Sequence, residues 1–253
     1  MSSENGHVIK STLDGLCTIE FYHPAHNALP GNLLESLRTS ILDAGKDADV
    51  RVILLKSAGD RTFCAGASFN ELISIQDEEI GKKFFSGFAN VINAIRSCGK
   101  IVIGRIQGKA VGGGVGLASA VDYCFATKYA SVKLSELNIG IGPFVIGPAV
   151  SRKVGLSAFS QMGLDAQTFY SAEWAREKGM YTHIYESAEL MDAAIAEFAI
   201  KLANYNPEAL IEMKKMLWIG TEDWDVLLSE RASISGRLVL SEFTKNMLAK
   251  YSK

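Results

Sequence analysis

Three consecutive glycines stand at residues 112–114, within the segment Val111–Leu117 (VGGGVGL). Glycine has no Cβ, so a ligand can approach the backbone closely and meet N–H groups there. The apolar run Ile101–Ile106 predicts a strand before the glycines, and a helix is expected after them. A helix N-terminus favours negative charge. The segment therefore predicts a site for a phosphate or an oxyanion; the alternative is a tight packing turn between strand and helix.

Two nucleotide-binding motifs do not fit this glycine segment. A P-loop needs Gly-Lys-Ser/Thr after the glycines, and no such sequence follows them. A dinucleotide-binding motif fits only if Ser119 is accepted in place of its last glycine. The segment also lies in the middle of the chain. We therefore do not expect a nicotinamide cofactor.

Small residues and isolated carboxylates supply the other candidates. The segment Phe63–Phe69 (FCAGASF) again permits close backbone approach, although such stretches are more often packing or turns. Glu136 follows a short strand in apolar surroundings, where desolvation raises a carboxyl pKa and makes a better base near neutral pH. Helix capping or an ion pair is its alternative role. For Asp122, also in apolar surroundings, we favour a structural role with hydrogen bonds to the backbone.

The elements that position these residues alternate between strand and helix patterns up to about residue 190. Apolar runs predict strands at 17–22, 51–56, 101–106, 121–126 and 131–134. The run at 51–56 is almost continuously apolar, as expected for a strand covered on both faces. Apolar residues at helical spacing predict helices over 32–44 and 78–95, and the aromatic stripe of the second is expected to pack in the core. Residues 139–150, with three glycines and two prolines, cannot form a regular helix throughout.

After about residue 190 the pattern becomes helical. It predicts helices over 190–205 and 207–217, the second starting at Pro207, and one or two more over 227–251. We therefore predict an α/β core over residues 1–190 and an all-helical region over residues 191–253.

The composition excludes several classes of protein. Of 253 residues, 48% are apolar and 21% are charged, close to the average of soluble globular proteins. Lys and Arg total 26 against 28 Asp and Glu, so the net charge of −2 gives no footprint for a nucleic-acid partner or an anionic membrane. No apolar run reaches the roughly 18 residues of a membrane helix. The first ten residues carry no apolar block, so we expect no secretory signal.

The four cysteines and four histidines do not form a metal-binding pattern. The cysteines stand far apart without a CxxC pair, and the histidines lack metal-ligand spacing. We expect no bound metal, and cysteines that serve as small buried apolar residues in a reducing compartment. These features favour a cytoplasmic protein.

Taken in order, these motifs resemble the crotonase superfamily, also called the enoyl-CoA hydratase/isomerase family, over nearly the whole chain. The resemblance begins at His23–Leu29 (HPAHNAL) and continues through Phe63–Ala67, Gln107–Gly114 and Glu136–Gly140 to Ser171–Gly179 (SAEWAREKG). It implies a spiral of repeated ββα units with a C-terminal all-helical region used in assembly into a homotrimer or a dimer of trimers. It also implies an acyl-CoA substrate, so that coenzyme A is part of the substrate and no cofactor is tightly bound.

The resemblance also assigns catalytic roles. Chemistry beside a thioester carbonyl passes through an enolate, whose negative charge develops on the thioester oxygen. The backbone N–H groups of Ala67 and Gly113 would stabilise that oxygen, and losing one such donor typically costs about 2.7–4 kcal/mol. Glu136 would move the proton as general base. Both donors belong to the backbone, which explains why these segments carry so few polar side chains.

Coenzyme A contacts are implied at a turn and at the first small-residue segment. By the resemblance, Ala25, His26 and Ala28 of the turn and the backbone of Ala65 would contact adenine and pantetheine. For His26, an exposed turn residue without a ligand is the alternative.

One departure from the family pattern bears on the reaction. Family hydratases usually carry a second glutamate two residues after the glycine triplet, and here that position is Gly116. Hydration normally uses two carboxylates, whereas moving a double bond from the 3- to the 2-position needs one. The residues therefore favour Δ3,Δ2-enoyl-CoA isomerisation. In the alternative, an enoyl-CoA hydratase of the methylglutaconyl type or another, Glu71 or Asp77 would replace the missing carboxylate.

A further alternative is a catalytically degenerate protein that binds CoA. Some crotonase relatives bind RNA, but salt-sensitive RNA binding needs clustered Lys and Arg, which the balanced charge disfavours.

Overall fold

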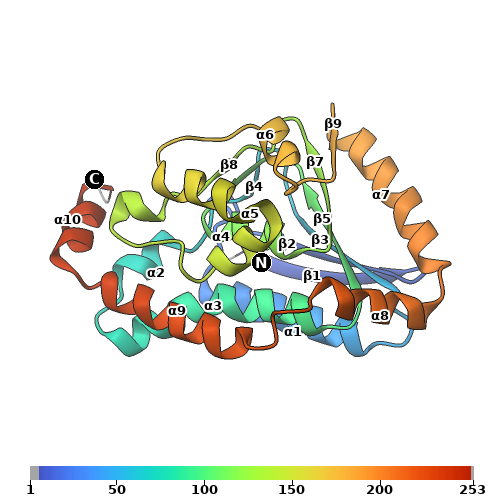
Figure 1. Ribbon diagram of the computed structural model, residues 1–253, viewed down its shortest axis with the longest axis horizontal. Coiled ribbons are helices and arrows are strands. Elements are labelled where there is room, and N and C mark those ends of the chain that lie inside the picture. Colours follow the sequence, from blue (N-terminus) through green and yellow to red (C-terminus); the bar gives the residue numbers. More distant parts are fainter. Residues whose placement is uncertain (1–5, 252–253) are drawn as a thin grey trace.

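The computed structural model describes residues 6–251, so the parts of our predictions that concern residues 1–5 and 252–253 lie outside it. Within the described residues the largest feature is a six-stranded sheet of order β1-β2-β3-β5-β7-β9 (Figure 1). Only β1 and β2 are antiparallel; the other neighbours are parallel. The strands are β1 (His7–Leu13), β2 (Leu16–Tyr22), β3 (Val52–Ser57), β5 (Ile101–Ile106), β7 (Tyr123–Thr127) and β9 (His183–Tyr185). The four strands predicted here are confirmed within two residues, and β1 and β9 are additional.

A second, three-stranded parallel sheet in the described residues has the order β4-β6-β8. Its strands are β4 (Thr62–Cys64), β6 (Lys109–Val111) and β8 (Val132–Lys133). Because the strands are parallel, the segments that follow them meet at one edge of the sheet, where ligands bind in many α/β proteins. These segments are 65–67, 112–114 and 134–136, the three motifs singled out in the sequence.

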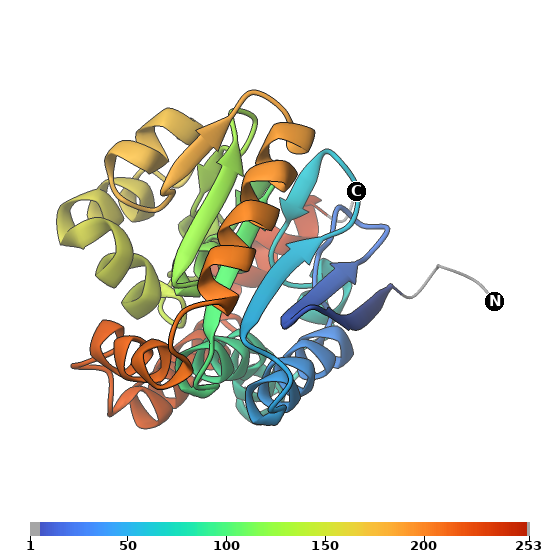
Figure 2. The same cartoon turned by 90° about the vertical axis from the view of Figure 1, so that its right-hand side faces the viewer.

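Strand β3 shows why its sequence is almost continuously apolar. Ile53 and Leu55 point into the main core, whereas Val52 and Leu54 pack in a second core with residues of α7 (Ala188–Ala203). Successive side chains of a strand point to opposite faces, so a sheet covered on both faces needs apolar residues at every position. Figure 2 shows α7 lying across one face of the sheet. The predicted two-sided cover is confirmed.

Helices α1 (Gly31–Lys46), α3 (Glu78–Ser97) and α9 (Trp224–Leu238) lie side by side below the sheet in Figure 1. Two glycines allow α3 and α9 to approach closely, because a Cβ on Gly81 would lie 2.8 Å from the Cα of Gly236. The predicted stripe of α3 is buried at its C-terminal end, but Ile80 is 45% exposed. The remaining helices are α2 (Phe69–Ile73), α4 (Gly113–Ala120), α5 (Gly147–Leu164), α6 (Ala172–Glu177), α8 (Pro207–Leu217) and α10 (Glu242–Tyr251).

The segment after β8 is irregular, as its glycines and prolines predict. A short 3₁₀ helix, η2 (Glu136–Ile139), ends at Gly140 with φ of 83°, and a loop leads to α5. The sequence pattern does not predict α5. The C-terminal region is helical as expected, with the last predicted stretch divided into α9 and α10, while the division at residue 190 stays a prediction.

Within residues 6–251, no helix has the length and apolar character needed to cross a membrane. The same residues contain no cluster of three or more His, Cys, Asp or Glu able to hold a metal ion. All four cysteines are free and buried, as expected for small apolar residues.

Candidate active site

A cavity of about 450 Å³ lies at the edge where the segments after β4, β6 and β8 meet. It is lined by backbone and side chains of those segments together with residues of α2, α3, the loop before α5 and α9. The predicted residues Ala65, Ala67, Gly113 and Glu136 all line it. The fold thus brings these four residues, which are far apart in the sequence, together at one cavity.

The glycine segment starts helix α4 and is constrained by packing. Gly112 precedes the helix with φ of 52°, a conformation that side chains disfavour. A Cβ on Gly113 would lie 2.4 Å from the Phe88 ring, and one on Gly114 would lie 2.4 Å from the Cys64 carbonyl oxygen. The packing turn considered for this segment is therefore real, and Gly112 and Gly113 line the cavity as well.

The backbone N–H groups of Ala67 and Gly113, both at the cavity, have no hydrogen-bond partner within the described part of the chain. Their neighbours are engaged, since Ser68 N–H donates to Leu29 and Gly112 N–H donates to Lys133, at 3.2 and 2.9 Å. The two loops also touch, because a Cβ on Gly66 would lie 3.5 Å from the Gly113 nitrogen. Unpaired N–H groups at a helix start suit an anion.

Glu136 begins η2 and carries the most perturbed carboxyl group of the cavity. Part of the residue remains accessible, but its Oε2 is buried and has no hydrogen-bond partner among the described residues. Burial raises the pKa of Glu136 to about 7, although backbone N–H groups of Glu136 and Ser135 oppose the shift. A Cβ on Gly112 would lie 3.0 Å from Oε1, so the carboxylate faces the glycine segment. A half-ionised carboxyl at neutral pH can both accept and return a proton.

A comparison of the sequence with models of protein families identifies the family of this chain. Residues 11–233 match the model of the enoyl-CoA hydratase/isomerase family. The chain belongs to this family. Its members act on acyl-CoA substrates, and the protein is an enzyme of the enoyl-CoA hydratase/isomerase family.

Individual relatives cover both chemistries of the family. The mitochondrial methylglutaconyl-CoA hydratase of Mus musculus is 31% identical over 74% of this chain, and the match spans 60% of the length of that relative. The peroxisomal Δ(3,5)-Δ(2,4)-dienoyl-CoA isomerase of Arabidopsis thaliana is 28% identical over 82% of this chain and 79% of its own. The crystal structure of an enoyl-CoA hydratase from Mycobacterium avium superposes with a TM-score of 0.87 at 26% identity, covering 100% of this chain and 97% of that one. The predicted crotonase fold is confirmed.

In this enoyl-CoA hydratase/isomerase family member, another side chain occupies the space beside Gly116, the position where a second glutamate would stand. Gly116 is buried in α4, and a Cβ there would lie 2.5 Å from Cγ2 and 2.8 Å from Cβ of Ile146. Ile146, itself buried and lining the cavity, precedes α5. A side chain at position 116 has no room unless Ile146 moves.

The two acidic residues considered as replacements are engaged elsewhere. Glu71 Oε2 accepts a hydrogen bond from Gly31 N–H at 2.9 Å, at the start of α1. Asp77 accepts from Ile80 N–H at 2.8 Å and caps α3. Neither lines the cavity, and Glu136 is the one carboxylate among the described residues that do.

The predicted CoA turn lies beside β4 rather than on the cavity wall. Ala25 and His26 are exposed and Ala28 is buried. The His26 carbonyl accepts a hydrogen bond from Ala65 N–H at 3.2 Å, which ties the turn to the cavity segment. The buried Asn27 side chain holds the turn by donating to the carbonyl oxygens of Ala58 and Thr62 at 2.9 and 2.8 Å.

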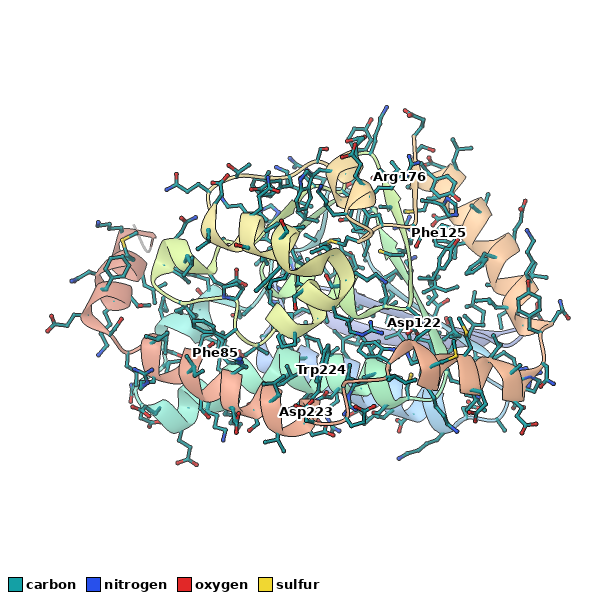
Figure 3. All side chains as sticks on the ribbon, viewed as in Figure 1. Phe85, Asp122, Phe125, Arg176, Asp223 and Trp224 are labelled. Atoms are coloured by element: carbon teal, nitrogen blue, oxygen red, sulfur yellow. The ribbon has the colours of Figure 1, made fainter. Side chains whose placement is uncertain are left out.

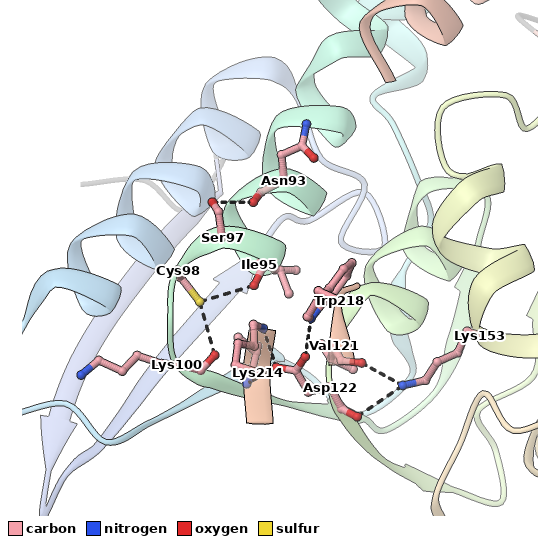
Figure 4. A network of polar contacts seen from close by, with 11 residues as sticks. Asn93, Ile95, Ser97, Cys98, Lys100, Val121, Asp122, Lys153, Lys214 and Trp218 are labelled. Atoms are coloured by element: carbon pink, nitrogen blue, oxygen red, sulfur yellow. Dashed lines mark hydrogen bonds and ion pairs between the residues drawn. The ribbon is translucent and has the colours of Figure 1, made fainter. Parts of the chain in front are cut away.

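Asp122 is structural, as predicted, but with a larger network than expected (Figure 4). Its carboxylate accepts from Val102 N–H at 2.8 Å and from the Trp218 indole at 2.7 Å. It also pairs with the Lys214 ammonium at 2.6 Å, and both side chains are 3% exposed. The network joins Asp122, the residue before β7, to Lys214 in α8 and to Trp218 at the end of that helix. Figure 3 labels Asp122 beside α8.

Sequence reasoning missed several wall residues. Phe84, Phe85 and Ser235 line the cavity, although the α3 stripe was interpreted as core. No local signal separates the two roles, because a wall of an apolar cavity and a core have the same helical spacing. Lys133 also lines the cavity, and its place three residues before Glu136 is the signal that could have identified it.

Proposed function

We propose that this protein is an acyl-CoA enzyme that shifts a double bond from the 3- to the 2-position of an enoyl-CoA. The observation that carries this proposal is the single carboxylate at the cavity. Glu136 is the one carboxylate among the described residues that line the cavity. Ile146 fills the space beside Gly116, where family hydratases place their second glutamate.

The substrate and the product of this isomerisation contain the same atoms, so no second reactant is needed. Ionised Glu136 removes a proton from C2 of the 3-enoyl-CoA. The electrons of that C–H bond form a C1–C2 double bond and the carbonyl π electrons move to the thioester oxygen, which gives a dienolate. Its negative charge lies on the thioester oxygen, toward which the Ala67 and Gly113 N–H groups are proposed to donate. Protonated Glu136 then delivers the proton to C4, which completes the 2-enoyl-CoA. A pKa of about 7 suits both steps, because the group is neither a very weak base nor a very weak acid at neutral pH.

Enoyl-CoA hydration is the second candidate, favoured by the names of relatives such as the mouse methylglutaconyl-CoA hydratase. It requires that one carboxylate both activate the water that attacks C3 and supply the proton to C2, or that Glu71 or Asp77 move into the cavity. A third candidate is a CoA-binding protein without turnover.

A paired assay with purified protein separates the three. One arm offers a 3-enoyl-CoA and follows formation of the conjugated 2-enoyl-CoA; the other offers a 2-enoyl-CoA and follows loss of conjugation by hydration. We expect turnover in the first arm alone, abolished by Glu136→Gln. Turnover in the second arm that persists in a Glu71→Gln/Asp77→Asn double variant would favour single-carboxylate hydration instead. CoA binding without turnover in either arm would support the degenerate protein.

The remaining expectations belong to the same proposal. Coenzyme A is held as part of the substrate by the turn at Ala25, His26 and Ala28 and by Ala65, and no other cofactor is tightly bound. The protein acts in the cytoplasm as a homotrimer or a dimer of trimers.

A further inference from the structure

The walls of the cavity divide by polarity. Its apolar lining consists of side chains from α2, α3 and the segment after Glu136: Phe69, Leu72, Phe84, Phe85, Phe88, Ile139, Ile141, Phe144, Val145 and Ile146. The charged side chains among the described lining residues are Glu136 and Lys133. The acyl part of a substrate that passes Glu136 therefore meets hydrocarbon.

The Lys133 ammonium lies over the ring of Phe169, a residue that does not line the cavity. It is 5.1 Å from the centre of the Phe169 ring, which is 44% exposed, and the Lys109 ammonium lies at the same distance from that ring. Neither ammonium thus lies within the apolar wall. An acyl chain ending in a carboxylate would bury a charge without a cationic partner, which is strongly unfavourable.

An aromatic pair on the cavity wall packs against residues of the C-terminal helices. Phe84 and Phe85 pack edge to face with ring centres 5.0 Å apart. Both rings pack against the cluster of Leu72, Ile75, Ile141, Val239 and Leu248, to which α10 contributes. Helix α10 is held against η2, because Thr244 Oγ1 occupies space 2.6 Å from where a Cβ on Gly140 would lie. Figure 3 labels Phe85 beside α9.

We propose that the cavity selects uncharged, apolar acyl groups, and that Phe84 and Phe85 set the length of chain it accepts. This inference rests on the acyl-CoA binding part of the proposed function, but not on isomerase turnover. It assigns the acyl group a chemical class and names two residues that determine specificity.

Calorimetric binding of saturated acyl-CoAs tests the proposal without catalysis. For butyryl-, valeryl-, hexanoyl-, octanoyl- and decanoyl-CoA we expect each added methylene to tighten binding about fourfold until the chain meets the aromatic pair. Glutaryl-CoA has five acyl carbons like valeryl-CoA, but a carboxylate in place of the terminal methyl group, and we expect it to bind at least tenfold more weakly. Phe85→Ala and the milder Phe85→Leu should move the end of the fourfold series to longer chains. Phe198→Leu removes a ring far from the cavity, stacked on Tyr123 at 4.3 Å, and should leave the series unchanged.

Two results would overturn the proposal. Glutaryl-CoA binding as tightly as valeryl-CoA, with the affinity lost in Lys133→Gln, would make Lys133 the receptor of an acidic acyl group. An unchanged series in a folded Phe85→Leu protein would remove the aromatic pair as the length determinant. The predicted binding pattern in a protein without turnover would keep this inference and reject the isomerase, whereas turnover with a reversed pattern would do the opposite.

Discussion

The filled space beside Gly116 can be tested with one methyl group. Gly116→Ala places a Cβ 2.5 Å from Cγ2 and 2.8 Å from Cβ of Ile146, distances at which one of the two must move. Gly163 in α5 is the matched control, because it is also a buried helical glycine and its added Cβ would meet only Pro143, at 3.9 Å. Both substitutions remove a flexible residue from a helix, so they differ in the clash alone.

The two substitutions should change the free energy of unfolding in opposite directions. Forcing a methyl group into a packed site costs about 1–3 kcal/mol, whereas Gly→Ala in a helix gains roughly 0.5–1 kcal/mol. Gly116→Ala should therefore lower the free energy of unfolding by about 1–2 kcal/mol, or the melting temperature by about 2–8 °C for a chain of this size. Gly163→Ala should leave it unchanged or raise it slightly. Ile146→Ala alone should cost about 2–5 kcal/mol, and the double variant less than the sum because the new methyl group enters the vacated space.

Denaturant unfolding, with the isomerase assay alongside, decides the matter. If Gly116→Ala is as stable as Gly163→Ala, the space beside residue 116 is open. The argument that a second carboxylate cannot stand there would then fail, and Gly116→Glu would become a direct route to a two-carboxylate site. If the clash is real, Gly116→Glu should require Ile146→Gly before the protein folds well.

The other predictions concern Glu136 and Asp122. Isomerase kcat/KM should rise about tenfold per pH unit below 7 and level off above it, since Glu136 must be ionised to act as base and its pKa is about 7; a profile centred near 4.5 would contradict the buried carboxyl. Because the pKa is raised on folding, the native state binds this proton more tightly than the unfolded chain does, so the stabilising contribution is complete below pH 4.5 and lost as pH rises through 7. Glu136→Gln should thus stabilise the protein by roughly 3 kcal/mol at pH 8 and by much less at pH 5, measured by unfolding at both pH values; equal effects at both would refute the linkage. Asp122→Ala should cost about 3–5 kcal/mol because it leaves the Lys214 ammonium buried without its partner, whereas Asp225→Ala, whose side chain is 71% exposed, should cost about 1 kcal/mol or less; similar losses would show that burial does not govern these pairs.

Local patterns in the sequence are enough to predict much of this protein. The almost continuous apolar run of β3 predicts a sheet covered on both faces. The helical spacing of α1, α3 and α8 predicts those helices within a few residues, because the period of the apolar side chains indicates which face is buried. The ordered small-residue segments and Glu136 identify the family and the candidate chemistry. The fold and the family could therefore be predicted before any coordinates.

What the tertiary structure alone decided is which groups meet. Three short parallel strands end at one edge of a sheet, and this brings residues 65–67, 113 and 136 to one cavity. The local spacing of apolar residues does not predict which strands pair across 70 residues of sequence. The contact between Gly116 and Ile146 joins α4 to a helix that the sequence pattern does not predict. Phe84, Phe85 and Phe88 of α3 all line the cavity, and Phe88 is at the same time part of the main core. Helical spacing says that a face is buried, but only packing says whether it is buried against protein or against a space that a substrate can fill.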